Sequence, residues 1–306
     1  MSAIQASEIL AETPLRDEES GGSIRQEAWR RLRRNPAAIA GFVLIALFVA
    51  VAALAPLLAP YDPVAQVRLR DIRPGLIPGP SGEHLLGVDA LGRDELSRLL
   101  FGARQSLLIG VGSTVIGFAA GGLLGVLAGG FGGWVDGLVM RIVDIMLAIP
   151  GLIFAIGVAA LLGKNRLALM IAIAVPAVPI FARLLRGSML SQRGRDYVLA
   201  STSLGVRRRN VVLGHVLPNS LSAVLVQGTL LLATAIIDAA ALSFLGLGTD
   251  DPGVPEWGRM LADSQNVLAV APHLAFLPCI AIVLSALGFT LLGESLREAL
   301  DPRFRR

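Results

Sequence analysis

Two aspartates lie inside long apolar stretches of the chain, and their side chains could do chemistry there. Asp144 follows Arg141 by one helical turn, which predicts a local ion pair. Asp238 has no basic residue at helical spacing. An ionised carboxylate at the centre of a bilayer costs about 2.5–3.5 kcal/mol on insertion scales, so it usually faces a cavity or a partner. We therefore expect Asp238 either to line a pathway or to accept hydrogen bonds from a neighbouring helix.

The sequence offers no set of residues typical of catalysis. The three histidines are not at metal-ligand spacing. A Walker A loop reads Gly-x4-Gly-Lys-Ser/Thr. The nearest approach is Gly157, Gly163, Lys164 and Asn165, which has five residues between the glycines and ends in Asn. We expect no catalytic residue, metal ion or cofactor on this chain, and enzyme functions, intramembrane proteolysis included, rank below transport.

Segment 190–218 is the most informative polar stretch. Gly205 is placed to end a helix in a left-handed turn, and a second short helical segment is expected to run up to Pro218. The pattern predicts a compact helix–turn–helix that suits insertion into a groove on another protein. Four residues of its first half follow i, i+3, i+4, i+7 spacing and give that helix one face of mostly small residues: Tyr197, Ala200, Ser201 and Leu204.

A stripe of small residues is predicted on one face of an apolar helix. It consists of Ser113, Gly117, Gly121, Gly125 and Gly129. Such spacing lets a second helix approach closely. Two interpretations follow, a sliding interface that lines a pathway or static packing within a helix bundle.

These residues must be positioned by membrane-spanning helices. The chain is 54% hydrophobic and 16% charged, with a mean hydropathy of +0.68, whereas soluble domains are about 25% charged. A span needs about 20 apolar residues. Prolines at 150, 176 and 179 are expected to break or bend their spans. Six stretches qualify: 37–59, 106–129, 137–162, 167–187, 221–247 and 272–293.

Basic residues between the spans set the expected orientation. Segments rich in arginine are cytoplasmic by the positive-inside rule, so both termini and segment 190–218 are expected inside. The same distribution indicates contact with lipid head groups and not with nucleic acid. The arginines of these segments are Arg30, Arg31, Arg33, Arg34, Arg183, Arg186, Arg193, Arg195, Arg207, Arg208, Arg209, Arg297, Arg303, Arg305 and Arg306.

Three regions follow from these patterns. Residues 1–36 are expected to form a cytoplasmic tail, disordered over 1–23, with an amphipathic segment at 24–35. Residues 37–105 form a first span and an external loop, in which Asp94 caps a short helix whose apolar stripe is either a gate or a plain surface. Residues 106–306 form a core of five spans with the loop 190–218.

Segment 190–218 also carries a family resemblance. Its Tyr-Val-x-Ala-Ser-x-x-x-Gly pattern from Tyr197 and its His-x-Leu-Pro-Asn pattern from His215 resemble the "EAA" coupling loop of binding-protein-dependent ABC importer permeases. Residues 84–98, 132–144, 241–248, 255–258 and 300–303 resemble motifs of the peptide/nickel branch, specifically the "C" subunit of dipeptide, oligopeptide and glutathione permeases. Leu199 stands where the name-giving Glu would be, and Ser201 replaces the second Ala.

The resemblance implies an all-α type I ABC importer permease with six spans in the bacterial plasma (inner) membrane. It implies a second homologous permease, two ATPase subunits, identical or different, that hold ATP and Mg²⁺, and an extracytoplasmic binding protein. The substrate would be a di- or oligopeptide or a related solute, moved by alternating access. A self-sufficient secondary transporter or a channel is the alternative, although a transporter would need embedded ion-coupling sites and usually an internal repeat.

Expected roles follow for residues of this chain, partly from the residue patterns and partly from the resemblance. Candidates for a pathway or gate are Gly117, Gly121, Gly125, Asp238 and Trp257. Candidates for coupling to the ATPase are Arg195, Tyr197, Ala200, Ser201, Leu204, Gly205, Arg207, Leu217 and Pro218.

Overall fold

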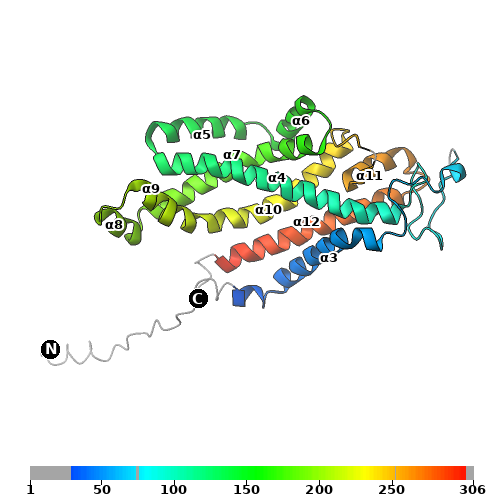
Figure 1. Cartoon of the computed structure of the whole chain (residues 1–306), viewed down its shortest axis with the longest axis horizontal. Coiled ribbons are helices and arrows are strands. Elements are labelled where there is room, and N and C mark those ends of the chain that lie inside the picture. The colour runs from blue at the N-terminus through cyan, green and yellow to red at the C-terminus, as the bar shows by residue number, and fades with distance from the viewer. Residues whose placement is uncertain (1–28, 74–75, 252, 301–306) are drawn as a thin grey trace, which may run out of the picture.

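The computed structural model describes residues 29–73, 76–251 and 253–300, and within them the chain is helices joined by loops (Figure 1). The β-type pairings of these residues are two isolated bridges. The predicted all-α fold is therefore confirmed. Five helices are long and apolar enough to cross a membrane: α3 (Pro36–Leu58), α4 (Glu95–Phe131), α7 (Arg166–Arg193), α10 (Leu217–Phe244) and α12 (His273–Leu300).

The sixth apolar stretch consists of two helices, α5 (Gly133–Leu147) and α6 (Gly151–Leu162), that bend by 94° at their break. Pro150 stands before α6 with extended backbone angles (φ −55°, ψ 128°). Proline lacks an N–H and disfavours a helical conformation in the residue before it, so the expected bend at this site has a local cause. Pro176 and Pro179, by contrast, lie inside α7 without ending it.

Helix α4 is longer than expected. Its 37 residues correspond to about 55 Å, against about 30 Å for the hydrocarbon core. Asp94 is its N-cap and accepts a hydrogen bond from the Ser97 amide at 2.8 Å. The predicted cap is confirmed, but the expected separate short helix is the first turns of α4, and the expected region boundary at 105/106 falls inside it.

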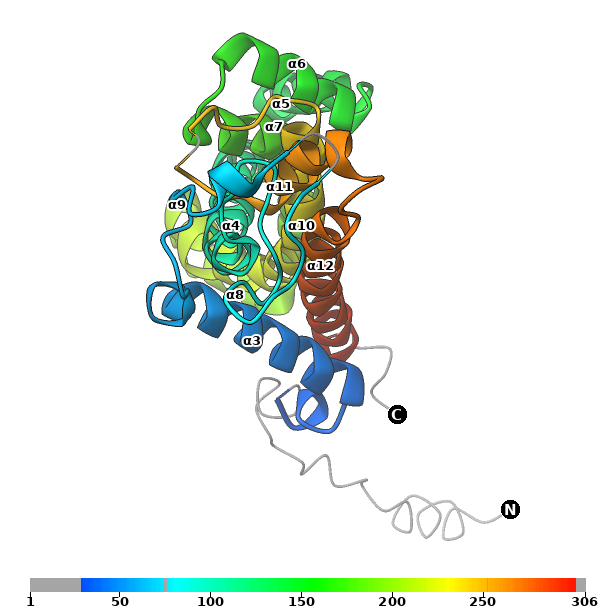
Figure 2. The same cartoon turned by 90° about the vertical axis from the view of Figure 1, so that its right-hand side faces the viewer.

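Short helices mark the two ends of the bundle. Residues 194–216 hold α8 (Asp196–Ser203), α9 (Arg208–Val211) and the π-helical turn η2 (Val212–Val216), which runs directly into α10; we call this the α8 end (Figure 1). Residues 60–94 and 245–272 hold η1 (Leu69–Asp71), α11 (Trp257–Ser264) and η3 (Gln265–Val267), and we call this the α11 end (Figure 2). The expected short second helix of segment 190–218 is thus continuous with the next span.

Helices α4 and α7 pack most closely in the middle of the bundle. A Cβ added to Gly121 would lie 2.4 Å from the carbonyl oxygen of Val178, and one added to Gly125 would lie 2.9 Å from that of Ala182. Only glycine allows this approach. The predicted small-residue stripe is therefore buried against α7 as packing within the chain.

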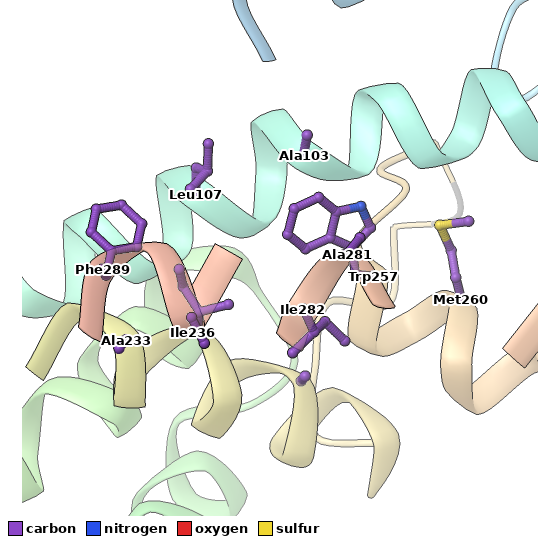
Figure 3. Packing of buried hydrophobic residues seen from close by; sticks show 11 residues of the cluster. Ala103, Leu107, Ala233, Ile236, Trp257, Met260, Ala281, Ile282 and Phe289 are labelled. Atoms are coloured by element: carbon purple, nitrogen blue, oxygen red, sulfur yellow. The ribbon is translucent and has the colours of Figure 1, made fainter. Parts of the chain in front are cut away.

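Near the α11 end, α4, α10, α11 and α12 enclose an apolar cluster around Trp257 (Figure 3). The indole N–H donates to the Leu99 carbonyl at 3.0 Å, and the backbone N–H donates to the Ser106 hydroxyl at 3.2 Å. The Phe48 ring of α3 meets the indole edge to face, with centroids 5.5 Å apart. Trp257 therefore joins α11 to α3 and α4.

The expected tail 1–23 and the start of the amphipathic segment lie outside the described residues. Residues 29–32 are helical, and the Arg33 guanidinium lies 4.9 Å from the centre of the Trp29 ring. Trp29 is otherwise half exposed. Trp29 and Arg33 thus form a cation–π contact at the surface.

Candidate functional site

Helix α8 ends in a left-handed turn at Gly205, whose φ is +77°. The Gly205 amide donates to the Thr202 carbonyl at 3.0 Å and the Val206 amide to the Ser201 carbonyl at 3.2 Å. These two bonds form a Schellman motif, which satisfies carbonyls at a helix end. A Cβ at Gly205 would meet nothing within 4 Å. The backbone angle and not the surrounding space therefore favours glycine here, and the predicted turn is confirmed.

The hairpin formed by α8 and α9 leaves apolar side chains exposed. Leu204 at its tip is 83% exposed, and Leu199, which takes the place of the glutamate, is 56% exposed. Tyr197 is partly exposed, and its hydroxyl donates to the Gln192 side chain at 2.8 Å. Ser201 and Leu217 are intermediate, while the rest of the expected coupling set is exposed, namely Arg195, Ala200, Gly205, Arg207 and Pro218.

One buried residue holds this hairpin to the bundle. Val198 is 6% exposed and packs in a cluster with Met189 of α7, Val211 of α9 and Val216 of η2. The sequence pattern identified the outer face of α8 and missed this inner contact. In the sequence, the signal for this contact was an apolar residue on the side of α8 opposite its small-residue face.

Two arginines, one before α8 and one at the start of α9, bind the same helix end. Arg193, the last residue of α7, donates to the carbonyls of Gly129 and Gly130, the latter at 2.8 Å. Arg208, the first of α9, donates to the carbonyls of Gly130 at 3.1 Å and Phe131 at 2.7 Å. Cations at the C-terminal carbonyls of a helix are favourable both as donors and through the helix dipole. The chain before α8 and the start of α9 are thereby both fixed to α4, which the sequence analysis did not predict.

Asp144 pairs with a different partner from the one predicted. Its carboxylate lies 2.5 Å from Arg183 of α7, whereas no ion pair joins it to Arg141 in the described part of the chain. Nearby, Arg186 of α7 binds Asp136 of α5 through two nitrogens, one of them at 2.6 Å. The expected i, i+3 pair is therefore wrong, because packing of α5 on α7 offers both acids a closer guanidinium across the helix pair.

Asp238 of α10 lines a cavity of about 470 Å³. The cavity lies between α4, α7, α10 and the break between α5 and α6. No ion pair or hydrogen bond of the Asp238 carboxylate occurs among the described residues. None of the stripe glycines and no part of Trp257 is among the residues that line this cavity, so of the predicted pathway residues only Asp238 faces open space there.

The α11 end holds a network of buried charges. Asp89 accepts hydrogen bonds from the Leu91 and Arg93 amides, each at 2.9 Å, and from the Arg93 Nε at 2.6 Å. Arg98 Nε lies 3.3 Å from the same carboxylate. Asp263 of α11 lies 3.4 Å from Arg93 and 3.8 Å from Arg98. These ion pairs bind α11 to the start of α4.

Glu256 is a deeply buried acid at the same end of the bundle. It caps α11 by accepting the Gly258 amide at 3.1 Å and is 1% exposed. Burial raises the pKa of this carboxyl to about 7. Desolvation disfavours the charged form, and this outweighs the amide and hydroxyl donors around the carboxyl.

Comparisons with known proteins identify the family. Residues 121–306 match the model of binding-protein-dependent transport system inner membrane components, and residues 23–76 match the N-terminal transmembrane domain of oligopeptide transport permease C. A glutathione transport system permease protein, GsiD of Pectobacterium atrosepticum, is 40% identical over 97% of both chains. A di/tripeptide transport system permease protein, DppC of Pseudomonas aeruginosa, is 43% identical over 92% of both chains.

The fold has a counterpart among solved structures. A chain in the structure of inward-facing conformations of the MetNI methionine ABC transporter superposes with a TM-score of 0.53 at 20% identity, covering 67% of this chain and 96% of that one. The fold is thus that of a type I ABC importer permease. The family match and the named relatives favour a permease subunit over an independent secondary transporter or channel. This multi-pass chain belongs to the family of binding-protein-dependent transport system inner membrane components.

Proposed function

We propose that this chain is one of two pore-forming subunits of an ATP-driven importer that moves short peptides, glutathione included, across the plasma membrane by alternating access. The names of the two relatives, which span nearly the whole chain, support this substrate class. The second pore subunit would be a homologous permease. The pathway would lie between the two.

In this proposal the α8 end is cytoplasmic, and so are both termini. The arginines of segment 190–218 support this orientation through the positive-inside rule. The start of α3 and the end of α12 also lie toward the α8 end in Figure 1. The α11 end would then face outward and receive the binding protein.

The observation that carries the proposal is the exposed hairpin of α8 and α9. It presents Leu204, Leu199 and Val206 to solvent, and a group of neighbouring exposed apolar side chains is typical of a protein interface. Two ATPase subunits that hold ATP and Mg²⁺ would bind these hairpins and close on ATP. Because Arg193 and Arg208 fix the hairpin to α4, its movement would turn the helices of the bundle.

The test is purification of the tagged chain from its own membranes, native mass spectrometry, and reconstitution into liposomes with ATP inside. We expect a second permease and two ATPase subunits to copurify. We also expect ATP-dependent uptake of dialanine, trialanine or glutathione when the binding protein is added outside. Isolation of this chain alone, or uptake that persists without ATP, would contradict the proposal.

A further inference from the structure

The cavity beside Asp238 combines a charged group with apolar walls. It is lined by α4, the ends of α5 and α6 at their 94° break, α7 and α10. Its volume of about 470 Å³ lies within the range of small-molecule sites, about 300–1,000 Å³. Among its lining residues Asp238 is the one ionisable group, and side chains such as Met146, Ile173 and Leu231 form most of the rest.

The neighbouring hydroxyls do not compensate the carboxylate. Ser113 donates to the Ile109 carbonyl at 2.7 Å, Thr114 to that of Gly110 at 2.9 Å, and Thr234 to that of Leu231 at 2.9 Å. Each hydroxyl proton is thus committed to the backbone of its own helix. Arg183 and Arg186 of α7 pair with Asp144 and Asp136. Among the residues that the structure describes, none therefore pairs with the Asp238 carboxylate, which faces the cavity.

A single carboxylate in a mostly apolar cavity favours a cation as its ligand. Carboxylates inside membranes are costly unless paired, and they mark substrate or ion pathways. The mostly apolar walls hold few polar groups that could impose a particular side chain. The site is suited to a ligand with one constant positive group and a variable apolar body.

We propose that this cavity binds the α-ammonium group of the transported peptide, with the Asp238 carboxylate as its counter-ion. This inference rests on the proposed peptide import and names a subsite for it. The ammonium group is common to all peptides with a free amino terminus, so one aspartate recognises the class while the apolar walls accept different residues. Peptides with a blocked amino terminus lack the required charge.

The first experiment measures transport by the reconstituted complex. We compare Asp238→Asn with Asp144→Asn, which removes a carboxylate that lies outside the cavity and is 60% exposed. Loss of a charge-assisted hydrogen bond predicts an uptake of trialanine lower by about tenfold or more for Asp238→Asn. Asp144→Asn should stay within about twofold, since exposed pairs contribute little. Equal uptake by the wild type and Asp238→Asn would overturn the subsite.

The second experiment separates recognition from a structural role. Dicyclohexylcarbodiimide, an apolar carboxyl reagent, is applied to the solubilised complex, and mass spectrometry follows modification of Asp238. Trialanine should slow the modification, whereas N-acetyl-trialanine should not. Equal protection by both peptides, protection by neither, or a carboxyl that never reacts would overturn the inference. If the wild type imports none of the tested peptides, the proposed function itself fails, so the two failures are distinguishable.

Discussion

At the α11 end, Asp89, Arg93 and Arg98 are each less than a tenth exposed and pair with one another, whereas at the α8 end Leu204 is 83% exposed and contacts no core. In the first region these buried charges pair within the chain. The second leaves apolar surface for another molecule. The contrast suggests that the α11 end depends on its own ion pairs for stability, while the α8 end is completed by a partner. Changes at the two ends should therefore have different consequences.

The largest effect is expected from Asp89→Ala at the α11 end. Breaking a buried ion pair from one side costs about 3–5 kcal/mol, because it leaves an uncompensated charge. Amide hydrogen exchange over residues 84–98 should accelerate by about a hundredfold or more. Asp250→Ala is the matched control, since its exposed carboxylate lies 3.6 Å from Lys164 and such pairs contribute at most about 1 kcal/mol. Equal acceleration in the two variants would remove the contrast between buried and exposed charges.

The next effect depends on pH and comes from Glu256. Its pKa is about 7 in the fold against 4.5 for a free carboxyl, so the folded state holds the proton more tightly than the unfolded state. The contribution of Glu256 to stability is therefore full below pH 4.5 and is lost as the pH rises from there through 7, by about 3 kcal/mol in total. Glu256→Gln should remove most of this dependence and be more stable than the wild type at pH 8.5.

The measurement for Glu256 is the midpoint of thermal unfolding of the complex at pH 5.5 and 8.5. Glu83→Gln is the control, since Glu83 is an exposed residue at the same end that pairs with Arg68. A wild-type midpoint that rises between the two pH values, relative to Glu256→Gln, would contradict the sign of the argument.

The next change, at Gly205, should cost less folding free energy than the two above. Its effect on transport should nevertheless be larger. A β-branched residue in a left-handed conformation is strained by about 1–2 kcal/mol, so Gly205→Val should displace the turn and abolish ATP-driven uptake. Membrane insertion should be unchanged. Gly205→Asn should retain uptake, because Asn tolerates this conformation. Gly214→Ala is the control for adding a side chain without straining the backbone. Gly214 lies in η2, and nothing lies within 4 Å of its Cβ position. Normal uptake by Gly205→Val would remove the turn from the coupling proposal.

The smallest effect is expected for Leu204→Ala. The side chain is exposed in this chain, so its removal should leave the unfolding midpoint unchanged. Burial at an interface with the ATPase predicts a loss of about 1 kcal/mol in association, seen as about fivefold weaker binding. Leu161→Ala, at an equally exposed leucine at the end of α6, should leave binding unchanged. Identical ATPase affinities for both variants would show that exposure at the α8 end has no special role.

Local sequence patterns predicted much of this architecture. Apolar length located the spans, the small-residue stripe predicted close helix packing, and Gly205 predicted a turn that the structure has. Each of these features depends on neighbours within a few residues along the chain. The bend at Pro150 was also local, although its angle depends on how α6 packs on α7.

Features that depend on distant residues were not predicted. Asp144 chose Arg183 over Arg141, because the packing of two helices decides which charges meet. The bonds from Arg193 and Arg208 to α4 join residues more than 60 positions apart. The cavity at Asp238 likewise needs four separate segments. The pattern of residues along the chain indicates candidates for these sites, but it does not show which of them contact one another.

Helix α4 fixes the rotational orientation of the α11 end relative to the α8 end. Its first turn holds Arg98 of the buried network, and its last carbonyls hold Arg193 and Arg208. Each residue of an α-helix advances the rotation by about 100°. The orientation of the network at the α11 end relative to the hairpin is therefore set by the number of residues between them. An insertion or deletion of one residue inside α4 would turn one end relative to the other by about 100°.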